Sequence, residues 1–175
     1  MNKVLVVVYS YTGTSRRVAD LLGGQQGWPV AEIRETHARR GAFGSLRCIV
    51  DSLLRRRPAI RYDGPPPGQF DAVVLVSPIW MLRLAGPMRS FLALHGSRLP
   101  NVAVLSVMGS RGASNAVVEV GALLGREPML SAAVTMREVD EGSYAAQLQA
   151  FGTAIGGEAH SHIVVRPVTL SPHST

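Results

Sequence analysis

The chain has 175 residues, of which 46% are hydrophobic and 17% are charged. This length is enough for one domain with its own core, and the composition excludes a disordered chain or a coiled coil. The single cysteine, Cys48, cannot form an internal disulfide, and every apolar run is far shorter than the ~18 residues of a membrane helix. We therefore expect a cytoplasmic protein without a membrane segment.

The charge balance is basic, with 18 Lys and Arg against 12 Asp and Glu, and all but one of the basic residues are arginine. Arginines cluster at residues 16–17, 39–40 and 55–57, without interleaved aromatic residues and outside any nucleic-acid-binding module. A solvated basic surface is the simplest interpretation, and binding of a phosphate-bearing cofactor or substrate is the alternative. We expect no nucleic-acid partner.

Five β-rich runs follow one another along the chain. They span residues 3–9, 30–33, 72–77, 102–107 and 129–136. The first, third and fourth runs are nearly all apolar without alternation, as expected of parallel strands that are covered on both faces.

Apolar stripes at helical spacing lie between these runs. In chain order they are Val18, Leu21 and Leu22; Leu46, Ile49, Val50 and Leu53; Leu84, Met88, Phe91 and Leu92; Val117, Val120 and Leu124; and Tyr144, Leu148, Phe151 and Ile155. Strands that alternate with helices indicate a doubly wound α/β sheet. We expect one domain over residues 1–157 and a peripheral tail over residues 158–175, in which residues 163–165 can add a short strand.

Ligands of open parallel sheets bind outside the carboxyl ends of the strands, where the strand order reverses. Three loops follow the first, third and fourth runs. They read S-Y-T-G-T-S at residues 10–15, S-P-I-W-M-L-R at residues 77–83 and M-G-S-R-G-A-S-N at residues 108–115. We expect the functional site in these loops.

The first loop gathers uncharged hydroxyl side chains around Gly13 and leads directly into a helix. A helix N-terminus carries unpaired N–H groups and a partial positive charge, so hydroxyls and amides wrapped around a glycine suit a phosphate. Ordinary N-capping by Thr14 or Ser15 is the alternative, but capping needs one hydroxyl rather than a cluster. The loop therefore predicts anion binding.

Several phosphate-binding classes are excluded by their motifs. The chain lacks G-x-x-x-x-G-K-[ST], and Gly13 stands alone where a dinucleotide fingerprint needs three glycines. A receiver domain needs acidic residues where Ser10 and Ser77 stand. A cysteine phosphatase needs its nucleophile in this loop, whereas Cys48 lies elsewhere and is expected to be a small buried hydrophobe.

The remaining pattern resembles flavodoxin-like proteins. Residues 9–15, Y-S-Y-T-G-T-S, resemble the loop that binds the phosphate of flavin mononucleotide (FMN) in that family. Residues 77–92 resemble its second flavin loop, and residues 41–58 are similar to a segment of a bacterial subgroup. The resemblance covers most of residues 3–155. It implies a three-layer α/β/α sandwich with a five-stranded parallel sheet in the order 2-1-3-4-5.

The resemblance also implies a role for each loop. The first loop would hold the FMN phosphate, the second would line the isoalloxazine ring, with Trp80 against it, and the third would offer backbone groups to the polar edge of the ring. The residues so assigned are Ser10, Tyr11, Thr12, Gly13, Thr14, Ser15, Pro78, Ile79, Trp80, Met108, Gly109, Ser110 and Arg111. For Trp80 the alternative is a core anchor.

The chain departs from electron-carrying flavodoxins, which are acidic around the flavin and have an aromatic residue in the third loop. Here the flavin-proximal loops carry Arg83 and Arg111, no carboxylate and no third-loop aromatic. A cation beside the ring stabilises the anionic reduced flavin. Either arginine would then tune the flavin or receive the phosphate of a nicotinamide cofactor, and both can equally be surface residues.

We therefore expect a redox protein with noncovalent FMN, which transfers electrons with a partner protein or acts as an NAD(P)H:quinone-type oxidoreductase. A homodimer is also compatible with the sequence. A binding module for another phosphorylated ligand is the rival reading, and a serine hydrolase at Ser110 is weaker, because Met108 replaces the first glycine of G-x-S-x-G. His160 and His162 lack a third ligand, so we expect no metal site. His95 is expected at the end of a helix.

Overall fold

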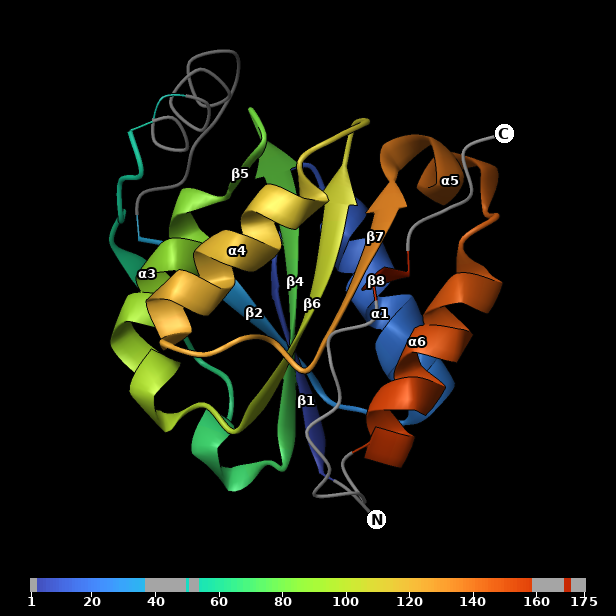
Figure 1. Cartoon of the computed structure of the whole chain (residues 1–175), viewed down its shortest axis with the longest axis horizontal. Helices are drawn as coiled ribbons and strands as arrows, with labels where there is room; N and C mark the ends of the chain where they lie inside the picture. Colours follow the sequence, from blue (N-terminus) through green and yellow to red (C-terminus); the bar gives the residue numbers. More distant parts are fainter. Residues whose placement is uncertain (1–2, 37–49, 51–53, 159–168, 171–175) are drawn as a thin grey trace.

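A mostly parallel β-sheet runs through the centre of the molecule, with helices on both faces (Figure 1). The structure is a computed structural model and describes residues 3–36, 50, 54–158 and 169–170. The strands are β1 (Val4–Tyr9), β2 (Val30–Glu35), β3 (Ile60–Tyr62), β4 (Ala72–Trp80), β5 (Arg83–Leu84), β6 (Asn101–Met108), β7 (Leu130–Thr135) and β8 (Thr169–Leu170). The helices are α1 (Thr14–Gln26), α3 (Gly86–His95), α4 (Ala113–Leu124), α5 (Met136–Glu141) and α6 (Ala145–Glu158).

The strand order confirms the predicted topology. The sheet reads β3-β2-β1-β4-β6-β7-β8, and the five predicted strands within it are parallel neighbours in the order 2-1-3-4-5. Three short strands were not predicted. Of these, β3 pairs antiparallel with β2, β5 forms a hairpin with β4, and β8, in the expected peripheral tail, pairs with β7. Runs of two or three residues carry too little pattern to be recognised.

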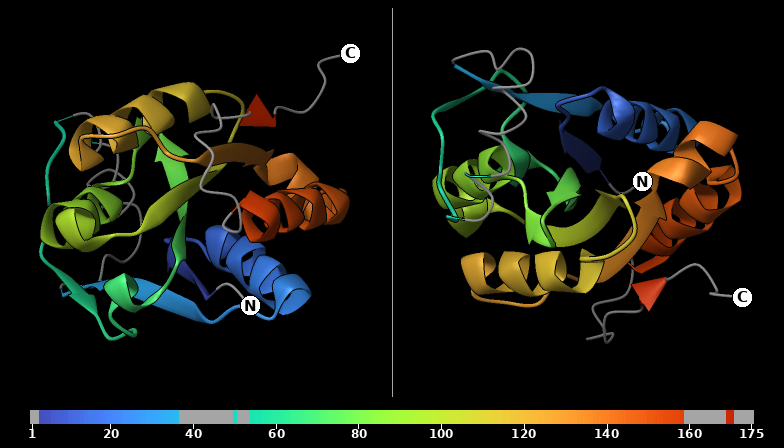
Figure 2. Two further views of the ribbon diagram at one scale, coloured as in Figure 1. Left: turned by 60° about the horizontal axis from the view of Figure 1, so that its bottom comes forward. Right: turned by 90° about the horizontal axis from the view of Figure 1, so that it is seen from above.

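The two faces of the sheet are covered by different helices. Figure 2 shows α1 and α6 together on one face and α3 and α4 on the other. Successive side chains of a strand point to opposite faces, so Val4, Val6 and Val8 of β1 pack toward α1 and α6. Leu5 and Val7 pack toward α3 and α4. Strands buried on both sides therefore read as unbroken apolar runs.

The four predicted helices that fall within the described residues form, with one shift at a boundary. The stripe Tyr144, Leu148, Phe151 and Ile155 is buried as expected. Leu84 does not belong to the third stripe's helix but to β5, because α3 begins only at Gly86, with proline in its first turn. The helix expected at residues 46–53 lies almost entirely outside the described residues. Among the described helices, none has the length and apolar content needed to cross a membrane.

His95 ends α3 as predicted. A helix C-terminus favours a protonated imidazole, but burial and the nearby cation of Arg98 lower the pKa of His95 and so disfavour its charged form. The imidazole lies against Tyr62 and Phe91, with ring centroids 5.5 Å and 4.7 Å away. His95 therefore serves as an aromatic member of the layer between α3 and β3.

The two leucines Leu148 and Leu94 offer a matched test of the core. Leu148 is fully buried in α6, whereas Leu94 on α3 is exposed. We expect Leu148→Ala to lower the free energy of unfolding by about 2–5 kcal/mol, because the neighbouring side chains cannot fill the cavity. The same change at Leu94 is expected to cost less than about 0.5 kcal/mol. Urea unfolding measures both values, and equal losses would contradict this assignment of the core.

Candidate functional site

The carboxyl ends of β1, β4 and β6 meet at one edge of the sheet, because the three strands are parallel neighbours. The loops that follow them enclose a cavity of about 100 Å³. Its lining comes from all three loops and from the start of α5: Tyr11, Thr12, Thr14, Ser15, Pro78, Ile79, Trp80, Val107, Gly109 and Met136. The structure thus brings together most of the residues that the sequence assigned to one site.

The first loop forms a cradle in front of α1. Gly13 is the N-cap residue with a φ of 90°, its N–H donates to Ser10 Oγ at 3.1 Å, and the hydroxyl oxygens of Thr12 and Thr14 lie 3.3 Å apart. No side chain caps the helix and its first turn holds no acidic residue. Capping by Thr14 or Ser15 is therefore not observed. The first N–H groups of α1 are left for a ligand, and the helix dipole favours an anionic one.

The cradle has a fixed inner side and an open outer side. Thr14 and Ser15 are buried, whereas Thr12 and Gly13 are exposed. A Cβ atom at Gly13 would meet no atom within 4 Å, so the glycine is needed for its left-handed backbone rather than for lack of space. Open space therefore lies directly in front of the positive end of α1.

Trp80 forms one wall of the cavity. It is the last residue of β4 rather than lying beyond the strand end as expected, because β4 continues into the hairpin with β5 and pairs Trp80 with Arg83. Its ring contacts Tyr9 and Tyr11 edge to face, with centroids 5.9 Å and 6.0 Å apart. The indole is half-buried. Trp80 is thus a fixed aromatic wall with one side accessible, and not a fully buried anchor.

Tyr9 is itself held in place from β2. Its hydroxyl donates to Glu35 Oε1 at 2.6 Å, which joins the carboxyl ends of β1 and β2. Such a charge-assisted hydrogen bond is stronger than a neutral one. The sequence reasoning missed this support, because a tyrosine at the end of an apolar run carries no signal of its partner.

The hairpin that carries Trp80 turns through two residues in the left-handed region. Met81 and Leu82 have φ values of 48° and 62°, as in a type I′ turn, for which Asn and Gly are the favoured residues. The turn lies directly against the third loop: a Cβ atom on Gly112 would sit 2.7 Å from Leu82 Cα. Only glycine fits there, for this contact and for its φ of 110°.

A buried ion pair fixes the base of the hairpin. Arg89 of α3 is only 2% exposed and donates through Nε and Nη2 to the carboxylate of Glu119 on α4. The same carboxylate accepts a hydrogen bond from the Leu84 N–H at 3.3 Å. Removal of either partner would take the opposite charge away from a buried ion, which is destabilising. The pair therefore connects α3, α4 and β5.

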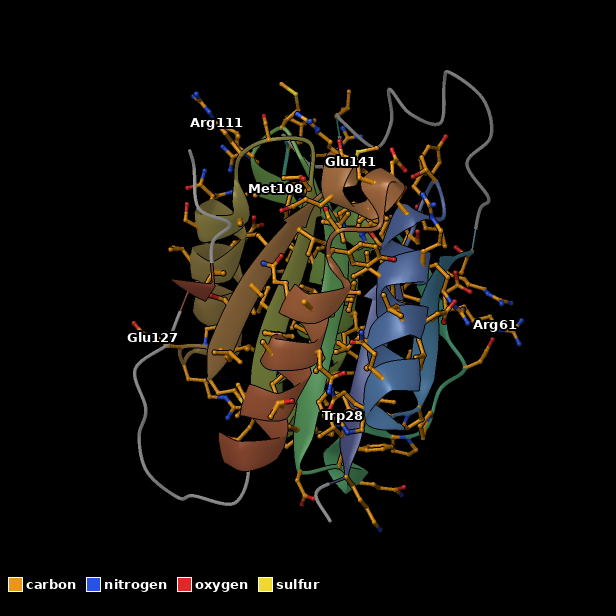
Figure 3. The ribbon with its side chains drawn as sticks, turned by 90° about the vertical axis from the view of Figure 1, so that its right-hand side faces the viewer. Trp28, Arg61, Met108, Arg111, Glu127 and Glu141 are labelled. Carbon is orange, nitrogen blue, oxygen red and sulfur yellow. The ribbon has the colours of Figure 1, made fainter. Side chains whose placement is uncertain are left out.

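The third loop contributes less than expected to the cavity. Gly109 lines it and Met108 is the half-buried end of β6, whereas Ser110 and Arg111 are exposed and do not line it. Figure 3 shows Met108 and Arg111 at the same edge of the sheet. Arg83 lines a second cavity instead, of about 510 Å³, between the hairpin and α4. The roles given to Arg83 and Arg111 stay predictions.

The arginine cluster beside the cradle is neutralised by carboxylates. Arg16 pairs with Asp20 at 2.8 Å and with Glu32 at 3.4 Å, and Arg17 pairs with Asp140 at 3.2 Å. These cations are therefore engaged at the sides of α1 rather than in front of it. The predicted features at Cys48, at residues 39–40 and at the pair His160 and His162 lie outside the described residues.

Met136 is a site residue that the sequence reasoning missed. The fifth strand was expected to include it, but β7 ends at Thr135 and Met136 opens α5, where it lines the cavity and is 45% exposed. A capping box begins this helix: the Glu138 N–H donates to Thr135 Oγ1 at 3.2 Å, and the Thr135 N–H donates to Glu138 Oε2 at 2.7 Å. The sequence T-M-R-E carries this signature and would have located the boundary.

Comparisons with known proteins give the fold. No protein-family model and no curated protein sequence matches the chain. Among solved structures, a flavoprotein in complex with FMN from Lactobacillus acidophilus NCFM has a TM-score of 0.67 and 19% sequence identity, over 82% of this chain and 99% of its own. A WrbA-like flavodoxin from Agrobacterium tumefaciens has a TM-score of 0.57 and 11% identity, over 93% and 100%.

Oxidised flavodoxin 1 from Bacillus cereus is a third similar structure, with a TM-score of 0.51 and 15% identity over 91% of this chain and 98% of its own. All three alignments extend over most of both chains, and the central five strands here have the order 2-1-3-4-5. The predicted resemblance is therefore confirmed at the level of architecture. The chain has the flavodoxin-like α/β/α fold of these flavoproteins.

Proposed function

We propose that this protein binds FMN noncovalently at the edge of the sheet and uses it for electron transfer. The observation that carries the proposal is the uncapped N-terminus of α1, without an acidic residue in its first turn, behind a loop of hydroxyls and joined by one cavity to Trp80. A structurally similar flavoprotein from Lactobacillus acidophilus NCFM was solved in complex with FMN, which supports this choice of ligand.

The cradle suits the phosphate of FMN for two reasons. The N–H groups of the first turn of α1 and the hydroxyls of Thr12 and Thr14 are the donors that a phosphate needs. The neighbouring Arg16 and Arg17 are already engaged with carboxylates. Backbone amides, hydroxyls and the helix dipole, rather than an arginine clamp, would therefore hold the dianion.

The isoalloxazine ring would extend from the cradle toward the open edge. A cavity of about 100 Å³ is smaller than the ~300–1,000 Å³ of typical ligand pockets, so much of the ring would extend beyond it. The ring would then lie against Pro78, Ile79 and Trp80, with Met136 across the cavity. Tyr9 and Tyr11 would keep the indole from turning away.

When bound, FMN would supply the one-electron and two-electron redox chemistry, and the protein would supply binding, orientation and electrostatics. Electron exchange with a partner protein is the leading function. An NAD(P)H:quinone-type oxidoreductase is the second candidate, favoured by the exposed Arg111 and by a third loop without aromatic residues, which leaves one face of the ring uncovered. A binding module for another phosphorylated ligand would use the cradle alone.

The two tryptophans provide a direct test of cofactor binding. Trp80 lines the cavity, whereas Trp28 lies at the opposite end of the sheet (Figure 3). We expect purified protein to be yellow, or to retain flavin after incubation with FMN and gel filtration. We also expect FMN to quench the emission of Trp28→Phe, which keeps Trp80, more strongly than that of Trp80→Phe. Fluorescence titration measures this. Absence of protein-bound flavin after free FMN has been removed by gel filtration, or stronger quenching of the variant that keeps only Trp28, would overturn the proposal.

The phosphate assignment is tested by comparing FMN with riboflavin, which lacks the phosphate. Thr12 is exposed, so Thr12→Asp adds a negative charge to the cradle without disturbing the core. We expect the Kd for FMN to rise about tenfold or more, since ~1.4 kcal/mol of repulsion is a factor of ten. The Kd for riboflavin should stay nearly constant. Thr153→Asp, on the exposed side of α6, adds the same charge elsewhere and should change neither value. An equal rise of the Kd for FMN and for riboflavin in Thr12→Asp would contradict this role of the loop.

Steady-state oxidation of NADPH with a quinone distinguishes the two redox functions. A protein that only exchanges electrons with a partner protein is expected to turn over far below ~1 s⁻¹, the lower end of ordinary enzyme rates. Turnover at or above that rate in the FMN-loaded protein would establish the oxidoreductase. Activity that is equal without FMN would contradict both.

A further inference from the structure

Large apolar side chains gather on the surface beside the Trp80 hairpin. Met81, Leu82 and Val118 are 56%, 49% and 72% exposed, and all three line the cavity of about 510 Å³ between the hairpin and α4. Leu54, 59% exposed, is the neighbour of Arg55, which lines the same cavity. We call these four residues the hairpin patch. Apolar surface of this kind, surrounded by polar groups, marks interaction sites in soluble proteins.

The turn of the hairpin holds its apolar residues against their conformational preference. Non-glycine residues with positive φ are uncommon, and Met81 and Leu82 adopt it in succession. The dipeptide Asn-Gly would adopt these φ values more readily and would expose no large apolar side chain to solvent. The contact of Leu82 with Gly112 and the hydrogen bond from the Leu84 N–H to Glu119 keep the strained turn in place. An outlier that its surroundings maintain in this way points to a function.

The surroundings of the patch are positively charged. Arg55 and Arg83 line the same cavity, and Arg111 directly precedes the Gly112 that touches the turn. None of the three arginines forms an ion pair within the part of the chain that the structure describes. The carboxylate that lines this cavity, Glu119, is already paired with Arg89. An apolar centre with a cationic rim suits a partner with carboxylates around an apolar contact.

We propose that the hairpin patch is the docking surface for a redox partner protein whose contact face is rich in carboxylates. This inference rests on the proposed function, because the patch begins at the residue that follows Trp80, the wall of the candidate FMN site. A partner seated on Met81 and Leu82 would lie beside the flavin, and the arginines would steer it there.

Two other occupants fit the surface less well. A second copy of the chain would bring the same arginines against this rim, and each copy carries a net charge of +6. A small ligand inside the cavity would leave Val118 and Leu54 largely uncovered, because both project more than half of their side-chain surface outward. A larger acidic partner buries the apolar centre and neutralises the rim together.

The test measures binding of the FMN-loaded protein to an acidic plant-type [2Fe–2S] ferredoxin, with basic cytochrome c as the probe of opposite charge. Titration calorimetry should give a Kd for ferredoxin that rises about tenfold or more between ~0.02 M and ~0.2 M salt, since salt screens exposed charges. Arg83→Glu should raise it at least tenfold at low salt. Arg61→Glu makes the same charge change on β3, on another side of the molecule (Figure 3), and should raise it less than about threefold.

The double variant Met81→Asn, Leu82→Gly separates docking from folding. It installs the favoured turn sequence, so the Tm should rise, by about 2–4 °C for each ~1 kcal/mol gained in a domain of this size. FMN affinity should be unchanged, while the Kd for ferredoxin should rise about tenfold, because the apolar contact is lost. A residue pair with only a structural role would not weaken binding while the fold becomes more stable.

Four outcomes would overturn the inference. The first is a Kd for ferredoxin that does not change in the hairpin variant or in Arg83→Glu, and the second is cytochrome c that binds as tightly as ferredoxin. The third is NADPH that displaces ferredoxin with the same dependence on Arg83, and the fourth is a dimer, seen in sedimentation, that the hairpin variant dissociates. The third would assign the cavity to a nucleotide and the fourth would assign the patch to a second copy. Failure of the proposed function would be seen in a separate measurement, as the absence of protein-bound flavin before any partner is added.

Discussion

The parallel register of β1, β4 and β6 is the constraint on which the site depends. Val8 of β1 lies beside Val76 of β4, and Ser77 of β4 lies beside Ser106 of β6, so the three strands end at nearly the same level. Each strand is buried on both faces, and a shift of one residue would turn its apolar side chains to the wrong side. The burial that fixes the register therefore also brings the three loops together.

Around this edge the molecule presents two surfaces of different chemistry. The cradle, Trp80 and Met136 enclose a small cavity that is lined by hydroxyls at one end and an aromatic ring at the other, with no charged side chain among the described residues that line it. The far side of the hairpin instead presents arginines and exposed apolar groups. The hairpin is the shared wall, because Trp80 faces one cavity and Arg83 the other. The proposed FMN site and the proposed docking surface would thus rely on different chemistry within four residues of sequence.

The long elements were predictable, because burial on both faces leaves an unbroken apolar run and burial on one face leaves a helical stripe. The cradle was also predictable from its composition, since hydroxyls around one glycine before a helix have few other uses. The hairpin was not, because Met81 and Leu82 are residues that propensity places outside a type I′ turn. The cavity that Arg83 lines could not be inferred for the same reason, because the turn that places it was not predicted. The pairing of Arg89 with Glu119 spans 30 residues and leaves no local pattern.

The buried pair of Arg89 and Glu119 has a consequence for how the molecule opens. An arginine does not lose its charge in a protein, so α3 and α4 cannot part without separating two opposite charges that lie beside an apolar layer. The opposite layer, α1 with α6, meets the sheet through the aliphatic and aromatic side chains of the core. Fluctuations of the native state should therefore move α3, the hairpin and α4 as one cooperative unit.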